Sequence, residues 1–336
     1  MKDRAISREV WLALLYLGLG VASALLWARI MRYETMVLAP GEPSRLESWH
    51  QEMISGRAPA PNQYRILVPW MAEGLSRVIP GWMADLACPP IPSQYLIASY
   101  WVIRALCLWL SLLVMDRYLR EWFSPGAAAG GALCLGALVP FTYYGVVQES
   151  DLLNLLVFVA AFWALARGKD GWLFPLVLVG TLNRETAAMI PAVYLLARWR
   201  EKPPLTVMVR TALLAACWAA VYGGLLLHYG RRGYYTEPFT LPANLGSWLP
   251  TAFVLLMFGV MWVLPWVALK HKPPTLLRRT TWLVPLFVLL QYLVGVVQEV
   301  RLFLPLAPIV LPLSWWVLFP ESRRAAPAVS GRTPKR

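Results

Sequence analysis

The stretch WLFPLVLVGTLNRETAAMIPAVYLLARW, residues 172–199, decides how this chain is arranged, because it is apolar except for a polar centre. Its two arms, 172–182 and 187–199, each have only about half to two thirds of the roughly 20 residues that a helix needs to cross a bilayer. Asn183, Arg184 and Glu185 separate the arms. The stretch is therefore either one long span with charges at its centre or a short hairpin with these charges at its tip.

Further apolar runs on both sides of this stretch predict a membrane protein. Of the 336 residues, 58% are hydrophobic and 15% are charged, whereas soluble domains carry about 25% charged residues. The net charge of +13 comes from Lys and Arg in short loops between the runs, a pattern typical of membrane topology rather than of a nucleic-acid surface. We therefore predict an all-α polytopic membrane protein with no nucleic-acid partner. The runs lie at about 10–30, 95–115, 126–145, 152–167, 206–229, 248–269, 280–297 and 302–319.

The distribution of positive charge favours the hairpin. If the first run enters from the cytoplasm, a hairpin over 172–199 leaves only Arg231, Arg232 and Arg301 outside after it, and a single span would invert this bias. We predict about ten membrane segments in a bacterial-type inner membrane, with both termini cytoplasmic. Residues 1–320 then form one transmembrane domain, and 321–336 form a disordered cytoplasmic tail. The cytoplasmic positive residues are Arg198, Arg200, Lys202, Lys270, Lys272, Arg278, Arg279, Arg323, Arg324, Arg332, Lys335 and Arg336.

The first external loop, residues 31–94, is long and not featureless. From Tyr64 to Val78 it has the pattern of an amphipathic helix lying at the membrane surface. Arg65 at its start is equally compatible with a lipid headgroup contact and with a ligand contact. His50, a lone histidine in the same loop, is predicted to be solvated.

Three short polar clusters interrupt the apolar runs, and the chosen topology places all of them on the external side. They are QESD (148–151), NRET (183–186) and QEVR (298–301). Ionisable residues at membrane depth usually face a cavity, pair with each other or bind a ligand. Helix N-termini capped by Ser150 and Asn183, together with arginine side chains, would form a phosphate site. The competing interpretation is purely structural: Arg184 pairs with Glu149 or Glu299, and Arg301 pairs with Asp151.

The order of these motifs resembles the GT-C class of polyprenyl-phosphate-dependent membrane glycosyltransferases. An acidic external loop follows the first span, and it contains EMISG (52–56) and YRILVP (64–69). The segment LNRETA (182–187) follows, and EVRLFLPLAP (299–308) precedes the last span. The large soluble C-terminal domain of many relatives is missing, and the usual Asp of the first loop is replaced by Glu.

The resemblance implies transfer of a sugar from a polyprenyl-phosphate donor to an acceptor on the extracytoplasmic face. It implies that Glu47 or Glu42 acts as the general base or binds a divalent cation. The other expected site residues, which contact the lipid phosphate and sugar, are Tyr64, Arg65, Glu149, Asp151, Arg184, Glu185, Glu299 and Arg301. Two alternatives remain open on the sequence: a transporter or flippase of an anionic lipid or solute, and a non-catalytic membrane scaffold.

Overall fold

The computed structural model describes residues 2–30, 44–87, 91–143, 150–234, 237 and 239–324. Within these residues the chain is helical and contains no β-strand, which confirms the predicted all-α class. Six stretches are long and apolar enough to cross a bilayer, as a multi-pass membrane protein requires. They are Arg8–Trp27, Gln94–Leu119, Pro125–Tyr143, Pro204–Tyr229, Trp248–Lys270 and Val300–Leu318.

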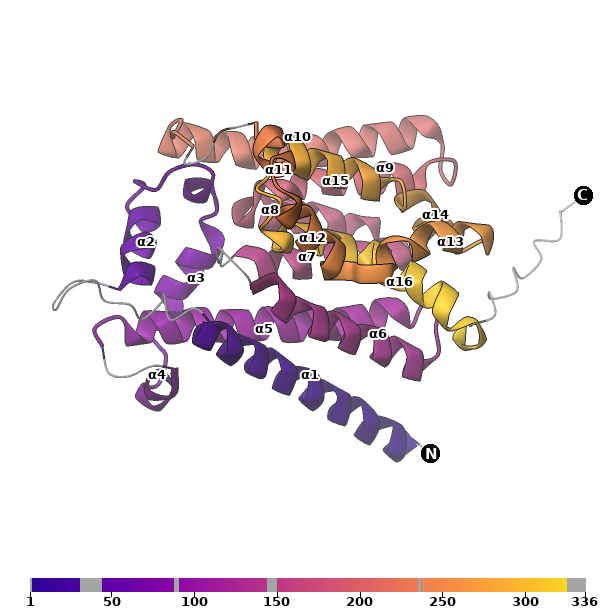
Figure 1. Cartoon of the computed structure of the whole chain (residues 1–336), viewed down its shortest axis with the longest axis horizontal. Helices are drawn as coiled ribbons and strands as arrows, with labels where there is room; N and C mark the ends of the chain where they lie inside the picture. The colour runs from indigo at the N-terminus through magenta and orange to yellow at the C-terminus, as the bar shows by residue number, and fades with distance from the viewer. Residues whose placement is uncertain are drawn as a thin grey trace, which may run out of the picture.

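The described ranges contain sixteen α-helices, and short 3₁₀ turns connect several of them (Figure 1). The α-helices are α1 (Lys2–Ile30), α2 (Arg45–Ile54), α3 (Leu67–Ser76), α4 (Gly81–Ala87), α5 (Gln94–Leu119), α6 (Pro125–Leu138), α7 (Ser150–Ala166), α8 (Leu173–Asn183), α9 (Met189–Arg198), α10 (Pro204–Tyr229), α11 (Leu241–Leu245), α12 (Trp248–Phe258), α13 (Leu264–Lys270), α14 (Thr275–Thr280), α15 (Leu283–Val294) and α16 (Ala307–Leu318). The 3₁₀ turns are η2 (Asn62–Tyr64), η3 (Val139–Tyr143), η4 (Asp170–Trp172), η5 (Glu185–Ala188), η6 (Gly259–Trp262), η7 (Val300–Leu306) and η8 (Pro320–Ser322).

Helix α5 is the central helix, since α1, α3, α4, α6 and α7 all pack against it. Its contact with α1 is close because α1 carries a glycine at the crossing. A Cβ atom on Gly20 would lie 2.7 Å from the backbone oxygen of Ala105, which is closer than real Cβ atoms approach. Gly18, on the exposed side of α1, has open space around it. The close crossing of α1 and α5 therefore requires a glycine at position 20 but not at position 18.

Residues 170–198 return to the end of the molecule from which they start. Asp170, before α8, forms salt bridges of 2.6 Å with Arg198 at the end of α9 and with Lys202 beyond it. At the opposite end of α8, the Asn183 side-chain nitrogen donates to the backbone oxygen of Ser150 (2.9 Å). Glycine again permits close packing at this end, because a Cβ on Gly180 would lie 2.9 Å from that of Ala187. The polar centre of the deciding stretch thus lies beside the start of α7.

The described residues between α1 and α5 contain the helices α2, α3 and α4, of which α3 lies within the predicted range 64–78. The prediction that His50 is solvated is wrong. Its side chain, on α2, is fully buried: Nδ1 lies 2.8 Å from the Tyr100 hydroxyl and Nε2 lies 3.1 Å from Glu73 Oε2. Burial lowers the pKa of His50, and the neighbouring Glu73 carboxylate opposes that shift. His50 therefore links α2 and α3 to the buried face of α5.

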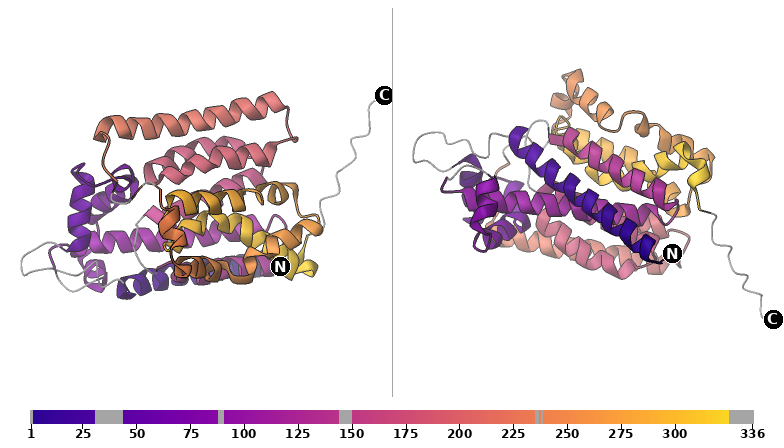
Figure 2. Two further views of the ribbon diagram at one scale, coloured as in Figure 1. Left: turned by 45° about the horizontal axis from the view of Figure 1, so that its top comes forward. Right: turned by 90° about the horizontal axis from the view of Figure 1, so that it is seen from below.

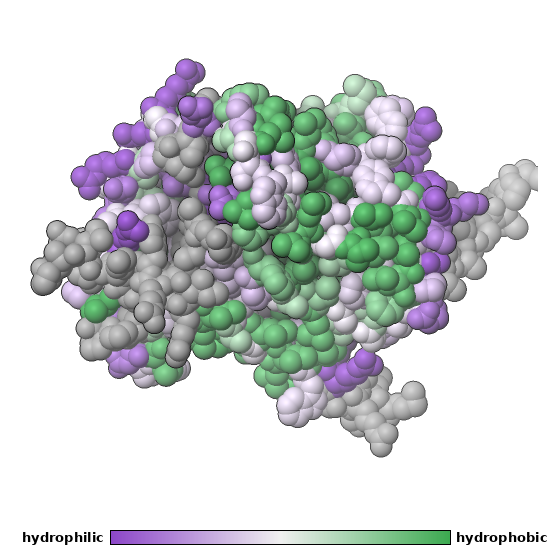
Figure 3. Space-filling view, viewed as in Figure 1, coloured by the Kyte–Doolittle hydropathy of each residue, from purple (hydrophilic) through white to green (hydrophobic). Residues whose placement is uncertain are grey.

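The outer surface is apolar over the middle of the molecule, and hydrophilic residues gather towards its two ends (Figure 3). Helix α10 runs along one edge and packs on α8 and α9 (Figures 1 and 2). Only 11% of the apolar window of α10 is buried, so most of its surface is available to lipid. The start of α1 and the end of α16 lie towards the same end of the molecule, at the right of Figure 1.

Candidate functional site

Asp151, in the first turn of α7, receives two arginine side chains. Arg301 of η7 donates from Nη1 to Asp151 Oδ2 (2.5 Å), and Arg184 donates from Nη1 to Oδ1. The side chains of all three residues are at most 3% exposed. Arg301 also donates to Glu299 Oε2. The pairing of Arg301 with Asp151 is therefore as the structural interpretation expected, whereas Arg184 pairs with Asp151 and not with Glu299. Glu149 lies outside the described residues.

A second ion pair joins the segment between α2 and α3 to the turn between α8 and α9. Arg65, directly after η2, donates from Nε to Glu185 Oε2 (3.0 Å) and from Nη2 to the other carboxylate oxygen. This two-point geometry fixes the relative orientation of both groups. Trp218 of α10 donates from Nε1 to the backbone oxygen of Glu185 (3.2 Å). The turn is thus held from the loop on one side and from α10 on another.

These charged groups meet at one cavity of about 400 Å³. Arg65, Arg184, Glu185 and Glu299 all line it, so three segments that are far apart in the sequence share one chamber. The remaining wall is largely apolar, and α15 contributes Phe287, Leu290 and Val294 to it. Two of its residues, Leu290 and Val294, are 44% and 55% exposed, so the cavity reaches the apolar outer surface. It therefore combines a charged interior with an apolar margin.

Arg184 has hydrogen-bond donors that the described part of the protein does not use. The single hydrogen bond of its side chain to a described residue is the one from Nη1 to Asp151. Its Nε is buried without a partner, although the side chain is only 3% exposed. A buried donor without an acceptor costs about 1–3 kcal/mol. A ligand oxygen in the cavity would recover part of this free energy.

Two acceptor groups of the cavity are also open. Gln291 of α15 is 5% exposed, and its side-chain amide makes no hydrogen bond to any described residue. Glu299 uses Oε2 for Arg301, which leaves its second carboxylate oxygen for the cavity. The amide and the carboxylate can accept hydrogen bonds from hydroxyl groups. Sequence reasoning missed Gln291, although an isolated glutamine inside the apolar run 280–297 was a usable signal.

The charges around the cavity nearly cancel. Three arginines, at positions 65, 184 and 301, face four carboxylates, at positions 151, 185, 237 and 299. Net positive charge therefore cannot hold an anion here. An anion would be held by the directional N–H groups of Arg184, and hydroxyl groups would be held by Gln291 and Glu299. The cavity is thus suited to a ligand that carries both an anionic group and hydroxyls.

Tyr64 does not line the cavity but supports its rim. Its hydroxyl donates to the backbone oxygen of Gly230 (2.9 Å) and accepts from the backbone N–H of Arg232 (3.1 Å). Tyr64 is 3% exposed, and its ring lies 5.7 Å from the ring of Tyr222. Its role in the structure is to hold the loop after α10 against the segment between α2 and α3.

The two proposed general bases are not brought to the cavity by the described structure. Glu42 lies outside the described residues. Glu47 is half-buried in the first turn of α2, where its backbone N–H donates to Ser44 Oγ (3.2 Å), and it is absent from the cavity wall. Over the described ranges, no group of three or more His, Cys, Asp or Glu residues is placed to hold a metal ion. The roles of Glu42, Glu47 and a divalent cation stay predictions.

Comparison of the chain with protein-family models, with curated proteins and with solved structures finds no match. The resemblance to the GT-C class therefore rests on the short sequence motifs and stays a prediction.

Proposed function

We propose that the protein is a GT-C-like glycosyltransferase that moves a sugar from a polyprenyl-phosphate donor to an acceptor on the extracytoplasmic face. The observation that carries the proposal is the cavity, in which unused donors of Arg184 and unused acceptors of Gln291 and Glu299 lie beside an apolar margin. A polyprenyl-phosphate sugar has a phosphate, hydroxyl groups and a long apolar chain. Each of these parts meets matching chemistry at the cavity.

The proposal includes a membrane arrangement with a re-entrant hairpin over 172–199. Helices α8 and α9 have 11 and 10 residues and are about 15–17 Å long, against a hydrocarbon core of about 30 Å. The salt bridge between Asp170 and Arg198 supports entry and exit on one side. Together with the six long stretches, α7 and α15, the two arms make ten membrane segments. Both termini are then cytoplasmic, and the cavity opens on the other face.

In this scheme the described residues bind and orient the donor. Arg184 donates hydrogen bonds to the phosphate, and these stabilise the charge that develops as the phosphate leaves. Glu299 accepts from Arg301 through one carboxylate oxygen, and its other oxygen can accept a hydrogen bond from a sugar hydroxyl. Deprotonation of the acceptor hydroxyl is assigned to Glu47 or Glu42, on the family resemblance, with a divalent cation as an optional partner.

Binding of a short-chain polyprenyl phosphate to the purified protein tests the proposal. A charge-assisted hydrogen bond is worth about 1.5–3 kcal/mol, so Arg184→Gln should weaken binding by at least about tenfold. Arg278→Gln, an exposed arginine away from the cavity, is the matched control and should leave binding unchanged. The protein should also release the sugar from a polyprenyl-phosphate sugar, and Arg184→Gln should slow this release.

The outcomes separate the three functions. Absence of binding to the wild-type protein, or equal binding by Arg184→Gln and wild type, would refute the glycosyltransferase. Movement of the lipid across proteoliposomes without sugar release would identify a transporter or flippase. If the wild-type protein binds no lipid phosphate and Arg184→Gln only lowers stability, the protein is a scaffold.

A further inference from the structure

A second groove lies at the opposite end of α7 from the candidate site. It has a volume of about 520 Å³ and lies between the end of α7 and the start of α8. Its α7 residues begin at Ala160, so at 1.5 Å per residue the groove starts about 14 Å along the helix from Asp151. Its walls include Trp163 and Ala164 from α7, Leu176 from α8, and Arg167, Lys169 and Trp172 from the connection. The groove is thus apolar along the helices and basic at its mouth.

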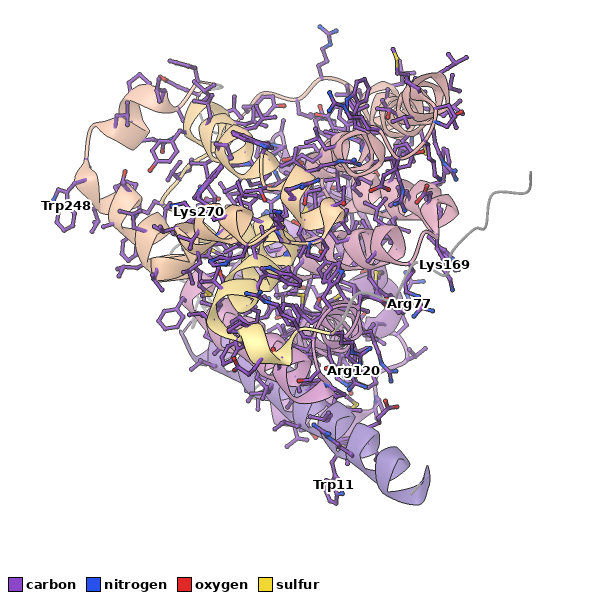
Figure 4. The ribbon with its side chains drawn as sticks, turned by 90° about the vertical axis from the view of Figure 1, so that its right-hand side faces the viewer. Trp11, Arg77, Arg120, Lys169, Trp248 and Lys270 are labelled. Atoms are coloured by element: carbon purple, nitrogen blue, oxygen red, sulfur yellow. The ribbon has the colours of Figure 1, made fainter. Side chains whose placement is uncertain are left out.

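The two cations at the mouth are available to a ligand. Lys169 is exposed and forms no ion pair or hydrogen bond through its side chain with any part of the protein that the structure describes. Figure 4 shows it at the edge of the molecule, pointing outward. Arg167 reaches Glu121 at 3.3 Å, and its side chain is 50% exposed. Such an exposed pair contributes little to stability, so a phosphate can replace the carboxylate.

The tryptophans add a donor and an interfacial anchor. The Trp163 Nε1–H is buried and has no hydrogen-bond partner among the described residues. Buried indole N–H groups usually find an acceptor, so this donor is open to an acceptor that the described residues do not supply. Trp172 is 62% exposed beside Lys169, and tryptophan is the residue that prefers the boundary between lipid headgroups and acyl chains.

We propose that this groove binds an anionic glycerophospholipid of the surrounding membrane. The phosphate lies between Lys169 and Arg167, an ester carbonyl accepts from Trp163 Nε1, and an acyl chain lies along Ala164 and Leu176. Basic pockets between membrane helices bind anionic headgroups in this way. The apolar length of the groove favours a whole lipid over a free phosphate. This lipid is separate from the proposed donor, because the groove and the cavity lie at opposite ends of α7.

Native mass spectrometry of the full chain, released from nanodiscs of equal phosphatidylglycerol and phosphatidylcholine, tests the proposal. The wild-type protein should retain phosphatidylglycerol preferentially. One lysine near an anionic surface is worth about fivefold in affinity, so Lys169→Gln should reduce this preference by about that factor. Lys270→Gln is the matched control: Lys270 is also exposed, but lies on the opposite side of the molecule in Figure 4, away from the groove. It should leave the preference unchanged.

Trp163→Phe keeps the aromatic ring and removes only the N–H donor, so it should shorten lipid retention without loss of helix content by circular dichroism. The proposal is overturned if wild type retains both lipids equally, or if Lys169→Gln and Lys270→Gln behave alike. It is also overturned if glycerol phosphate in solution displaces the lipid, since the groove would then bind a free phosphate. If Lys169→Gln fails to fold, Lys169→Arg takes its place. It keeps the positive charge and should therefore retain the preference for phosphatidylglycerol.

Discussion

Replacement of Asp151 by asparagine tests the arrangement at the centre of the candidate site. Asp151 contacts both Arg184 and Arg301, and all three side chains are buried. Asparagine has nearly the same shape but carries no charge. The variant therefore leaves two buried guanidinium groups beside each other without the carboxylate that they share.

The expected loss is large. Removal of one partner from a buried ion pair costs about 3–5 kcal/mol, because the remaining charge stays buried without compensation. Glu9→Gln is a matched control, since Glu9 also contacts two arginines, Arg117 and Arg120, but is 49% exposed. Exposed pairs contribute about 0–1 kcal/mol, so this control should change stability little.

The assay is the free energy of unfolding in mixed micelles, measured by titration with sodium dodecyl sulfate and followed by tryptophan fluorescence. If Asp151→Asn loses less than about 1 kcal/mol, or no more than Glu9→Gln, the buried hub does not exist as described. Addition of Arg184→Gln to Asp151→Asn should recover part of the loss, because one uncompensated charge is removed with it. Purely additive losses would contradict direct contact between the two residues.

Three further predictions concern packing, protonation and the cavity. Gly20→Ala should lower the free energy of unfolding by about 1–3 kcal/mol, because the new Cβ meets a backbone oxygen of α5. The control Gly18→Ala, on the open side of α1, should leave the free energy of unfolding unchanged or raise it slightly. Equal effects of the two substitutions would refute the close crossing of α1 and α5. Burial lowers the pKa of His50, so the folded state holds it neutral while the unfolded imidazole, with a pKa of about 6.5, takes up a proton. The free energy of unfolding should therefore be constant above about pH 6.5 and should fall by up to about 1.4 kcal/mol per pH unit below it. His50→Gln should make this fall shallower. A pH profile that the substitution leaves unchanged would contradict the prediction. Gln291→Leu should leave the free energy of unfolding unchanged or raise it, because the Gln291 amide makes no hydrogen bond to the described residues. The same substitution should weaken the binding of polyprenyl phosphate. Unchanged binding would exclude Gln291 from the ligand site.

Much of the site was predictable from the sequence because charges inside apolar runs are expensive. Asp151, Arg184 and Arg301 had to find partners or a cavity, and the structure brings all three together. Hydropathy and residue periodicity likewise predict the all-α class correctly. These signals are either local in the sequence or follow from the cost of burying a charge in an apolar environment. They can therefore be recognised without knowledge of the tertiary packing.

The partners themselves were not predictable, because they depend on how helices distant in the sequence are rotated against each other. Arg184 contacts Asp151 and not Glu299, a choice set by the packing of α8 and η7 on α7. His50 is buried because Tyr100 of α5 lies over it, and nothing in the loop sequence indicates that contact. Gln291 resembles any isolated polar residue until the cavity wall is known.

The central claim is that the charged turn after α8 opens into an extracytoplasmic cavity that holds a lipid phosphate. Its most direct test is labelling of Ala188→Cys, an exposed position on the cavity wall, in a chain whose four native cysteines are replaced by alanine. We expect a membrane-impermeant maleimide to react from outside intact cells, and a short-chain polyprenyl phosphate to slow the reaction in purified protein. Reaction only after the cells are permeabilised, or a rate that the lipid leaves unchanged, would contradict the claim.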